Sequence, residues 1–244
     1  MITYQTLQNN RRQFLALTGL TLSEFQRLLT AFPRAYQQHY PANQTAEGQP
    51  RQRAVGGGCK GRLEQPEDKL LFLWVYLKTY PLQAIMGELL GLSTPRVNYW
   101  IHRLLPVLRS ALDDLGVLPE RDPTHFAEAP GASGKAPRLI IDATERRRQR
   151  PKNPAKQALF YSGRKKKQCA KNVVIVNTRG KRIAYLSQTY PGKMHEKKIA
   201  DEERISYPPG ATLYKDSGFQ GYEPAVKKTW QAKKKATPRK AHRG

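Results

Sequence analysis

Two aspartates, each at the end of a predicted strand, are the residues whose type and position suggest metal chemistry. Asp142 follows the apolar run Leu139–Ile141, and Asp216 follows the segment Thr212–Lys215. A short apolar run is typical of a buried strand, which would deliver each carboxylate at its end. Mg²⁺, or Mn²⁺ in its place, prefers oxygen ligands, and a pair of such ions can activate the attacking oxygen on a phosphodiester. For either aspartate alone, a helix cap or a turn is the simpler interpretation.

The elements predicted around these aspartates form a sheet-rich second half. Asn172–Asn177 and Arg182–Leu186 are typical of two strands, and Gly180 lies in the turn between them. Residues 195–205 have the composition of a short charged helix. The run Arg164–Lys167 places four consecutive cations beside these strands, and we expect Arg164, Lys165, Lys166 and Lys167 to hold a DNA backbone.

The first half of the sequence has the pattern of a helix-turn-helix. The first helix of this half is predicted to end at Pro33, and an apolar central helix over residues 70–80 is closed by Pro81. A short helix over residues 82–90 then meets Gly91, which suits a tight turn, and Thr94 is the expected cap of the next helix.

One side of that last helix is apolar and the other is polar and basic. The apolar positions are Val97, Ile101, Leu104 and Leu108. The predicted DNA-reading positions are Arg96, Asn98, Tyr99 and Arg103. In a helix-turn-helix the second helix enters the major groove, where arginine pairs with guanine and asparagine with adenine. An ordinary helical bundle with a polar outer face remains the alternative.

Positive charge is concentrated in the second half of the chain. The formal net charge is +24, with 43 Lys+Arg against 19 Asp+Glu, and residues 138–244 carry +20 of it. So much like charge repels itself unless a polyanion is the partner, which favours nucleic acid. An anionic membrane surface is the weaker candidate because the basic stretches lack an apolar aromatic face. A basic RNA-associated or ribosome-associated protein is a further alternative.

No targeting or membrane segment is recognisable. The first ten residues lack the charged start and apolar core of a signal peptide. The longest apolar run, residues 70–77, is well short of the ~20 residues that span a bilayer. We therefore expect no membrane partner and a cytoplasmic location.

Several phrases of the second half, taken in order, resemble one family. They are IDATER at 141–146, RP at 150–151, YSGRKKK at 161–167, KNVV at 171–174, YPGKMHE at 190–196 and KDSGFQG at 215–221. This set resembles the DDE-superfamily transposases of IS5-type bacterial insertion sequences, which are related to the Harbinger-type endonucleases. The resemblance is strong over about residues 138–225 and weaker over about 20–115.

The resemblance implies an RNase H-like fold, Mg²⁺ dependence, and cleavage and joining of double-stranded DNA at the ends of a mobile element. By motif, Asp142 and Asp216 match the first and second catalytic, metal-binding aspartates. His195 matches a histidine that the family follows with aspartate, where this sequence has Glu196. We expect His195 to cap or orient the next helix rather than to take part in the chemistry. A homo-oligomer, or a complex with a full-length transposase, is the expected assembly.

The sequence departs from this family after Asp216. A third carboxylate is expected about three dozen residues later, but no acidic residue follows Glu223. We therefore expect an incomplete metal site, caused by gene decay or by a programmed frameshift at Lys233–Lys235. An absent helix would leave an apolar sheet face exposed. A DNA-binding regulator of the full-length enzyme, without catalytic activity, is the alternative function.

The predicted fold class is α+β, an all-α helix-turn-helix domain followed by an incomplete RNase H-like α/β domain. The expected boundaries are residues 1–118 for the helical domain and 119–137 for a Pro/Gly-rich linker. The RNase H-like domain is expected over 138–226 and a basic tail over 227–244.

Overall fold

Helices alone build the first of the two units into which the chain divides, residues 1–117 and 118–244. The structure, a computed structural model, describes residues 2–45, 48–52, 61–129, 132, 136–180 and 182–232. We call the two parts the helical unit and the sheet unit, and each is described by itself. No helix in the described ranges is long and apolar enough to cross a membrane.

The helical unit is organised around one buried helix. Its helices are α1 (Tyr4–Leu7), α2 (Arg11–Thr18), α3 (Leu22–His39), α4 (Pro66–Thr79), α5 (Gln83–Leu90) and α6 (Thr94–Asp114). On α4, four consecutive side chains, Leu70 to Leu73, are fully buried. A helix that buries all its sides must be surrounded, and α2, α3 and α6 pack around α4. The predicted central helix is confirmed.

The α5–turn–α6 segment has the expected helix-turn-helix geometry. Gly91 ends α5 in the left-handed conformation with φ 66°, as the tight turn requires. All four predicted apolar positions of α6 are buried in the core. The cap prediction is wrong by one residue, because extended Ser93 precedes the helix and Thr94 is already its first residue.

The predicted end of the first long helix at Pro33 is also wrong. Pro33 lies inside α3, which continues to His39. An internal proline costs about 3 kcal/mol because a hydrogen bond is lost and the ring crowds the preceding turn. Phe32 and Ala35, on either side of Pro33, are fully buried, and their packing against the core favours the continued helix.

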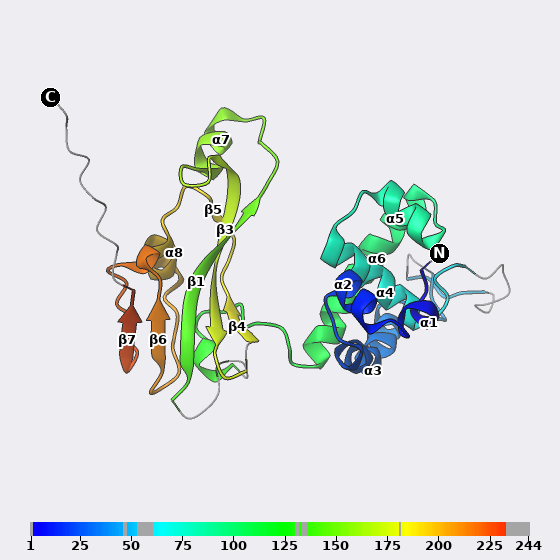
Figure 1. The fold of residues 1–244 in the computed structure, drawn as a ribbon, viewed down its shortest axis with the longest axis horizontal. Helices are drawn as coiled ribbons and strands as arrows, with labels where there is room; N and C mark the ends of the chain where they lie inside the picture. Colours follow the sequence, from blue (N-terminus) through cyan, green and yellow to red (C-terminus); the bar gives the residue numbers. More distant parts are fainter. Residues whose placement is uncertain are drawn as a thin grey trace. The chain divides into compact units, whose positions relative to one another are not determined.

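A mixed sheet forms the second unit (Figure 1). The elements are η1 (Phe126–Glu128), β1 (Arg138–Arg147), α7 (Pro154–Phe160), β2 (Tyr161–Ser162), β3 (Lys167–Asn177), β4 (Arg182–Leu186), β5 (Tyr190–Pro191), α8 (Glu196–Glu203), β6 (Thr212–Lys215), η2 (Ser217–Phe219) and β7 (Lys228–Gln231). Across the sheet the strands run β4-β3-β1-β6-β7, with β1, β3 and β4 antiparallel and β1, β6 and β7 parallel. This helical domain followed by a mixed α/β sheet domain is the predicted fold class, and the sheet is consistent with an RNase H-like fold.

One face of the sheet is covered. Leu139 and Ile141 on β1, Val173 and Ile175 on β3 and Leu213 on β6 are fully buried. They share a core with Ile199 and Ala200 of α8 and with Phe126 of η1. Because side chains alternate along a strand, the residues between them point to the opposite face.

That opposite face carries an apolar row that stays exposed. The row crosses five strands in register and consists of Ile183, Val176, Ile140, Tyr214 and Trp230. Ile183 and Trp230 are each about half exposed, and Ile140 is 43% exposed. We call the side of the sheet that carries this row the open face. It matches the exposed apolar sheet face expected from the sequence.

Two predicted boundaries differ in the structure. The segment 119–137 was expected to be a linker, but Phe126 is fully buried against Tyr185 and Tyr207, and Glu120 pairs with the backbone of β4. The expected basic tail begins with a strand, because β7 pairs with β6. Residues 233–244 of that tail, including the expected frameshift position, lie outside the described residues.

A buried carboxylate fastens α8 to the sheet. Glu203 is 5% exposed and accepts hydrogen bonds from the hydroxyls of Tyr185 and Tyr190 and from the backbone N–H of Gln188. Desolvation, followed by the hydrogen bond to Glu203, raises the pKa of both tyrosines above the ordinary value. Both hydroxyls therefore stay protonated and keep donating at neutral pH.

Candidate active site and DNA-binding surfaces

Asp142 and Asp216 lie side by side on the open face. The last registered pair between β1 and β6 is Ile141 with Lys215, and the two aspartates are the next residues on their strands. Neighbouring strands are about 5 Å apart. Both aspartates are exposed, while Ile141 and Lys215 are buried on the covered face, so the structure brings the two predicted site residues together.

The surroundings of Asp142 differ from the prediction in one respect. Asp142 was expected to end its strand, but β1 continues to Arg147 because β3 goes on pairing with it, from Val174 opposite Asp142 to Cys169 opposite Arg147. Only the parallel neighbour β6 ends at this level. The carboxylate therefore lies at the end of the parallel pairing and within a strand held by β3, which fixes its backbone on that side.

Each carboxylate is oriented by a backbone N–H. Asp142 accepts from Ala143 at 2.7 Å, and Asp216 accepts from Ser217 at 2.6 Å and caps η2. The turn-forming interpretation is thus correct for Asp216, but it uses one oxygen. In the described part of the chain, no hydrogen bond or ion pair engages the second oxygen of either carboxylate. Those oxygens are available as ligands.

The backbone of Asp216 is fixed from β7 and from the covered face. The side-chain amide of Gln231 donates to the Asp216 carbonyl oxygen at 3.0 Å. Lys215 is 7% exposed, and its ammonium donates to the carbonyl of Tyr222 beyond η2. The loop that presents the second carboxylate is therefore held at both ends.

His195 and Glu196 lie at the start of α8. His195 is the N-cap, and its Nδ1 accepts from the Lys197 N–H at 3.4 Å, which is the capping role expected from the sequence. Glu196 lies directly against Gly218, since a Cβ at Gly218 would overlap its carboxylate. A contact with the loop after Asp216 was not predicted from the sequence, where Glu196 was noted only as a departure from the family pattern.

Two or three carboxylates can hold a divalent ion. The described residues provide two, those of Asp142 and Asp216. No group of three or more His, Cys, Asp or Glu side chains in these residues is arranged to hold a metal. Two carboxylates with one available oxygen each, on an exposed surface, suit a hard cation that keeps several waters. The donor set therefore fits Mg²⁺ or Mn²⁺ as part of a site.

The cationic run lies at the far end of the same sheet. Lys165–Lys167 are exposed on the hairpin between β2 and β3. Lys167 is seven residues along β3 from the partner of Asp142, which is about 23 Å at the usual strand rise. Arg164 forms an ion pair with Glu196 at 3.6 Å. The lysines of the run thus lie away from the two aspartates along the sheet, whereas Arg164 reaches Glu196, which lies against the loop after Asp216.

A buried ion pair supports the hairpin. Glu145 of β1 lies 3.4 Å from Lys171 of β3, and both side chains are less than 10% exposed. Glu145 also accepts from the Ser162 hydroxyl at 3.0 Å, and Lys171 donates to the Met194 carbonyl. With its polar atoms satisfied, the pair holds β1, β2 and β3 together beneath the exposed lysines.

On α6, three of the four predicted DNA-reading residues are exposed, and the Arg96 guanidinium lies 5.8 Å from the Tyr99 ring centroid. Arg96, Asn98 and Tyr99 are exposed in the first two turns. Arg103 differs, because its guanidinium carbon is 3.4 Å from the Tyr40 ring centroid and its Nε donates to the Tyr36 hydroxyl. Arg103 joins α6 to α3, and a burial pattern calculated for α6 alone could not have shown this.

Comparison with family models gives two matches. Residues 141–243 match the model described as DDE superfamily endonuclease, and residues 61–114 match the one described as helix-turn-helix of DDE superfamily endonuclease. The matches indicate a DDE-type transposase. They cover both aspartates and the α5–α6 segment, and they support a DNA-binding and DNA-cleaving function. No curated protein and no solved structure matches the chain. DDE superfamily endonucleases generally use divalent metal ions.

Proposed function

We propose that this chain belongs to an IS5-type transposase that cleaves and joins double-stranded DNA at the ends of an insertion sequence. The observation that carries the proposal is the pair Asp142 and Asp216, adjacent on one face at the end of the parallel β1–β6 pairing. Both aspartates lie within the matched endonuclease region.

In this proposal the two carboxylates hold the metal through their available oxygens. A bound Mg²⁺ or Mn²⁺ would supply activation of the attacking water or hydroxyl and stabilisation of the leaving oxygen. The backbone N–H groups of Ala143 and Ser217 keep the carboxylates oriented. Glu196, held against Gly218, restricts the loop after Asp216 and so helps to position it.

The helical unit would recognise the element end. Arg96, Asn98 and Tyr99 are exposed in the first two turns of α6, and in this proposal Arg96 and Asn98 contact base edges in the major groove. Arg164 and Lys165–Lys167 would contact DNA phosphates, which adds a salt-dependent contribution to affinity. Arg103 acts as a scaffold between α3 and α6 and reaches at most a phosphate.

A third carboxylate is part of the proposed complete site. Among the described residues no third acid joins the pair, and the printed sequence has no acid after Glu223. We infer that full activity needs a third acid beside this pair, and a frameshifted product is one proposed source of it. Such enzymes act at paired ends, so a homo-oligomer or a mixed complex with a full-length transposase is the proposed assembly.

A DNA-binding regulator is the second candidate. The helical unit has a hydrophobic core of its own, with 21 buried residues, so end binding does not depend on the metal site. A chain that occupies the element ends without cutting would repress the active enzyme.

The test is Mg²⁺-dependent nicking of a DNA duplex that carries the element end. The 244-residue chain is compared with a chain extended in the downstream reading frames, and Asp142→Ala and Asp216→Ala are made in both. Asp201→Ala, an exposed aspartate of α8, is the matched control. We expect cutting by the extended chain, its loss by orders of magnitude in both aspartate variants, and no change in the control. End binding without cutting by any form would reject catalysis and favour the regulator.

A further inference from the structure

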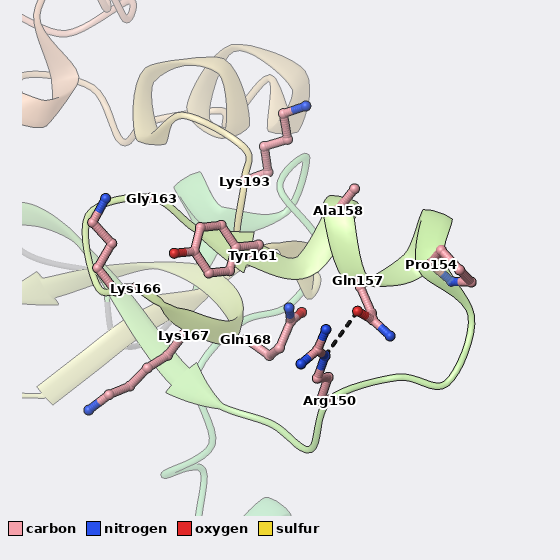
Figure 2. A pocket seen from close by; sticks show the side chains of 10 residues that line it. All are labelled: Arg150, Pro154, Gln157, Ala158, Tyr161, Gly163, Lys166, Lys167, Gln168 and Lys193. Atoms are coloured by element: carbon pink, nitrogen blue, oxygen red, sulfur yellow. Dashed lines mark hydrogen bonds between the residues drawn. The ribbon is translucent and has the colours of Figure 1, made fainter.

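A cavity lined by cations lies between α7 and the β2–β3 hairpin, away from the two aspartates. Its volume is about 800 Å³, within the range of small-ligand pockets. Arg150, Lys166, Lys167 and Lys193 line it together with neutral side chains, and no acid is among the lining residues. Figure 2 shows Arg150, Gln157 and Gln168 close together, with the ammonium groups of Lys167 and Lys193 extending outward on opposite sides. Such a cavity is suited to an anion.

The neutral side chains that line the cavity include an aromatic ring and an amide, which are suited to binding a planar, polar group. Tyr161 is 42% exposed, and its ring lines the cavity together with Pro154 and Ala158. Gln157 is held in place, since its oxygen accepts from Arg150 Nε at 2.9 Å and its amide donates to the Pro151 carbonyl at 2.8 Å. An ordered amide and an aromatic ring at one cavity are typical of sites that bind nucleobases.

Gln168 supplies an independent observation. Its side-chain oxygen is buried and has no hydrogen-bond partner among the described residues, although it lines the cavity. A buried acceptor without a donor is unfavourable, and native structures rarely leave one. A donor entering the cavity would reach this carboxamide after rotation about its last side-chain bond.

The cavity is built on rigid backbone. Gly192, beside Lys193, is buried, and its N–H donates to the Cys169 carbonyl at 3.0 Å. The Lys193 N–H donates to the Leu159 carbonyl at the end of α7. Gln168 pairs in register with Tyr161 across β2 and β3. The backbone positions that carry the ring, the amide and one of the cations are therefore fixed relative to one another before any ligand arrives.

We propose that this cavity binds one unpaired nucleotide of a DNA strand. Tyr161 stacks on the base, the Gln168 carboxamide accepts from a base N–H, and Lys167 and Lys193 hold the adjacent phosphates. The proposal rests on the proposed function for the presence of DNA, but not on cleavage. Lys167 lies about 23 Å along β3 from the partner of Asp142, so this side of the cavity would hold a nucleotide displaced from the duplex rather than the bond that is cut.

The experiment compares the affinity of the full chain for two fluorescent duplexes, one flush-ended and one with a single-stranded overhang of a few nucleotides. We expect tighter binding of the overhang duplex. Tyr161→Ala should remove about tenfold of that preference, the usual size of one base–aromatic contact. Tyr80→Ala, another exposed tyrosine, is the matched control and should leave the preference intact.

Gln168→Leu distinguishes a role of Gln168 in ligand binding from a role in stabilising the fold. If the amide only supports the fold, this variant should melt at a lower temperature. We expect its melting temperature to be unchanged or higher, because a buried unsatisfied acceptor is removed, while the overhang preference falls. A lower melting temperature together with an unchanged overhang preference would overturn the role of Gln168.

Lys167→Ala and Lys193→Ala test the phosphate contacts. Each should reduce the slope of log affinity against log salt by about 0.7 for the overhang duplex. Lys198→Ala removes the same charge from α8, where Lys198 lies 3.8 Å from Glu202, and should leave the slope unchanged. Equal effects on flush and overhang duplexes would mean ordinary surface contacts and would overturn the proposal.

Two further measurements identify the ligand class. Deoxyadenosine monophosphate should displace the overhang, whereas inorganic phosphate at the same ionic strength should not, and equal displacement would reduce the cavity to a phosphate site. Asp142→Ala should keep the overhang preference. If the extended wild-type chain also keeps the overhang preference but cuts no DNA, the proposed enzyme is rejected while the nucleotide site is retained.

Discussion

The helical unit and the sheet unit bury their apolar side chains in different ways. The helical unit surrounds α4 with other helices, so its core is closed on every side of that helix. The sheet unit buries one face of its sheet and leaves a five-residue apolar row on the other. Both proposed metal ligands lie on that exposed side. The helical unit can therefore bind through its surface alone, whereas the sheet unit has apolar side chains and both carboxylates exposed on one face.

The largest expected effect separates the stabilities of the two units. Glu203→Ala removes the acceptor of two tyrosine hydroxyls and of the Gln188 N–H. Each buried donor left unsatisfied costs about 1 to 3 kcal/mol, so the free energy of unfolding of the sheet unit should fall by about 4 kcal/mol. Thermal unfolding followed by near-UV circular dichroism measures this.

The neighbouring acid provides the control. Glu202→Ala removes a side chain that is 43% exposed and should change the unfolding free energy by less than about 0.5 kcal/mol. End binding by the helical unit should survive both changes. Equal losses in the two variants would show that Glu203 does not fasten α8.

Two adjacent isoleucines test the difference between the sheet faces. Ile141 is fully buried, whereas Ile140 is 43% exposed on the open face. Ile141→Ala should cost about 3 kcal/mol, while Ile140→Ala should cost about 1 kcal/mol or less and reduce self-association. Urea unfolding and sedimentation velocity measure the two effects. A cost at Ile140 as large as that at Ile141 would mean that the open face is covered in solution.

Two glycines test how rigid the backbone is around the cation-lined cavity between α7 and the β2–β3 hairpin. A Cβ at Gly192 would come within 2.7 Å of the carbonyl oxygens of Cys169 and Phe160, which are backbone atoms. Gly192→Ala should therefore destabilise the sheet unit by about 2 kcal/mol. Gly163→Ala, where a Cβ meets nothing within 4 Å, is the matched change and should be almost neutral. Calorimetry of the two proteins would refute this account if their transitions coincided.

The smallest expected effect concerns the helical unit. Thr21 caps α3 and forms a capping box with Glu24, and Thr21→Ala should cost about 1 kcal/mol. The hydrogen bonds from Thr21 lower the pKa of Glu24, so the stabilisation from this interaction is present above the unfolded pKa and is lost as the pH falls through the folded one.

Measurement of stability against pH checks the sign of this effect. The difference between wild type and Thr21→Ala should shrink below about pH 4, near the ordinary glutamate pKa. Thr30→Ala, which removes an exposed hydroxyl of the same helix, should show no such pH dependence. A difference that grew in acid would contradict the capping box.

Local patterns predicted much of the helical unit. The four apolar positions of α6 follow from 3.6-residue periodicity, and the Gly91 turn follows from the need for a left-handed residue. The same reasoning failed at Pro33, because the burial of Phe32 and Ala35 is a tertiary effect that outweighs a local preference. Arg103 was misplaced for the same reason, since its partners lie on another helix.

For the sheet unit, the sequence predicted where the aspartates lie along the chain, but not which strands pair with each other. The aspartates could be placed after apolar runs, whereas their adjacency depends on the register of β1 with β6. The contact of Glu196 with Gly218 and the three bonds of Glu203 join segments that no local pattern connects. Residues 119–129 read as a linker because their composition is loop-like, and Phe126 alone gave a weak signal of burial.

The parallel pairing of β1 with β6 also determines when each unit can fold during synthesis. The β1–β6 ladder pairs Ile141 with Lys215, so it can form only after the 74 residues up to Lys215 have been synthesised. Contacts that distant in sequence form slowly, whereas helical units with local contacts fold in microseconds to milliseconds, and domains emerge from the ribosome at about 5–20 residues per second. The helical unit is therefore complete for several seconds before the two aspartates first meet. A nascent chain still attached to its ribosome therefore already carries a folded helix-turn-helix that can bind DNA before the endonuclease region is complete.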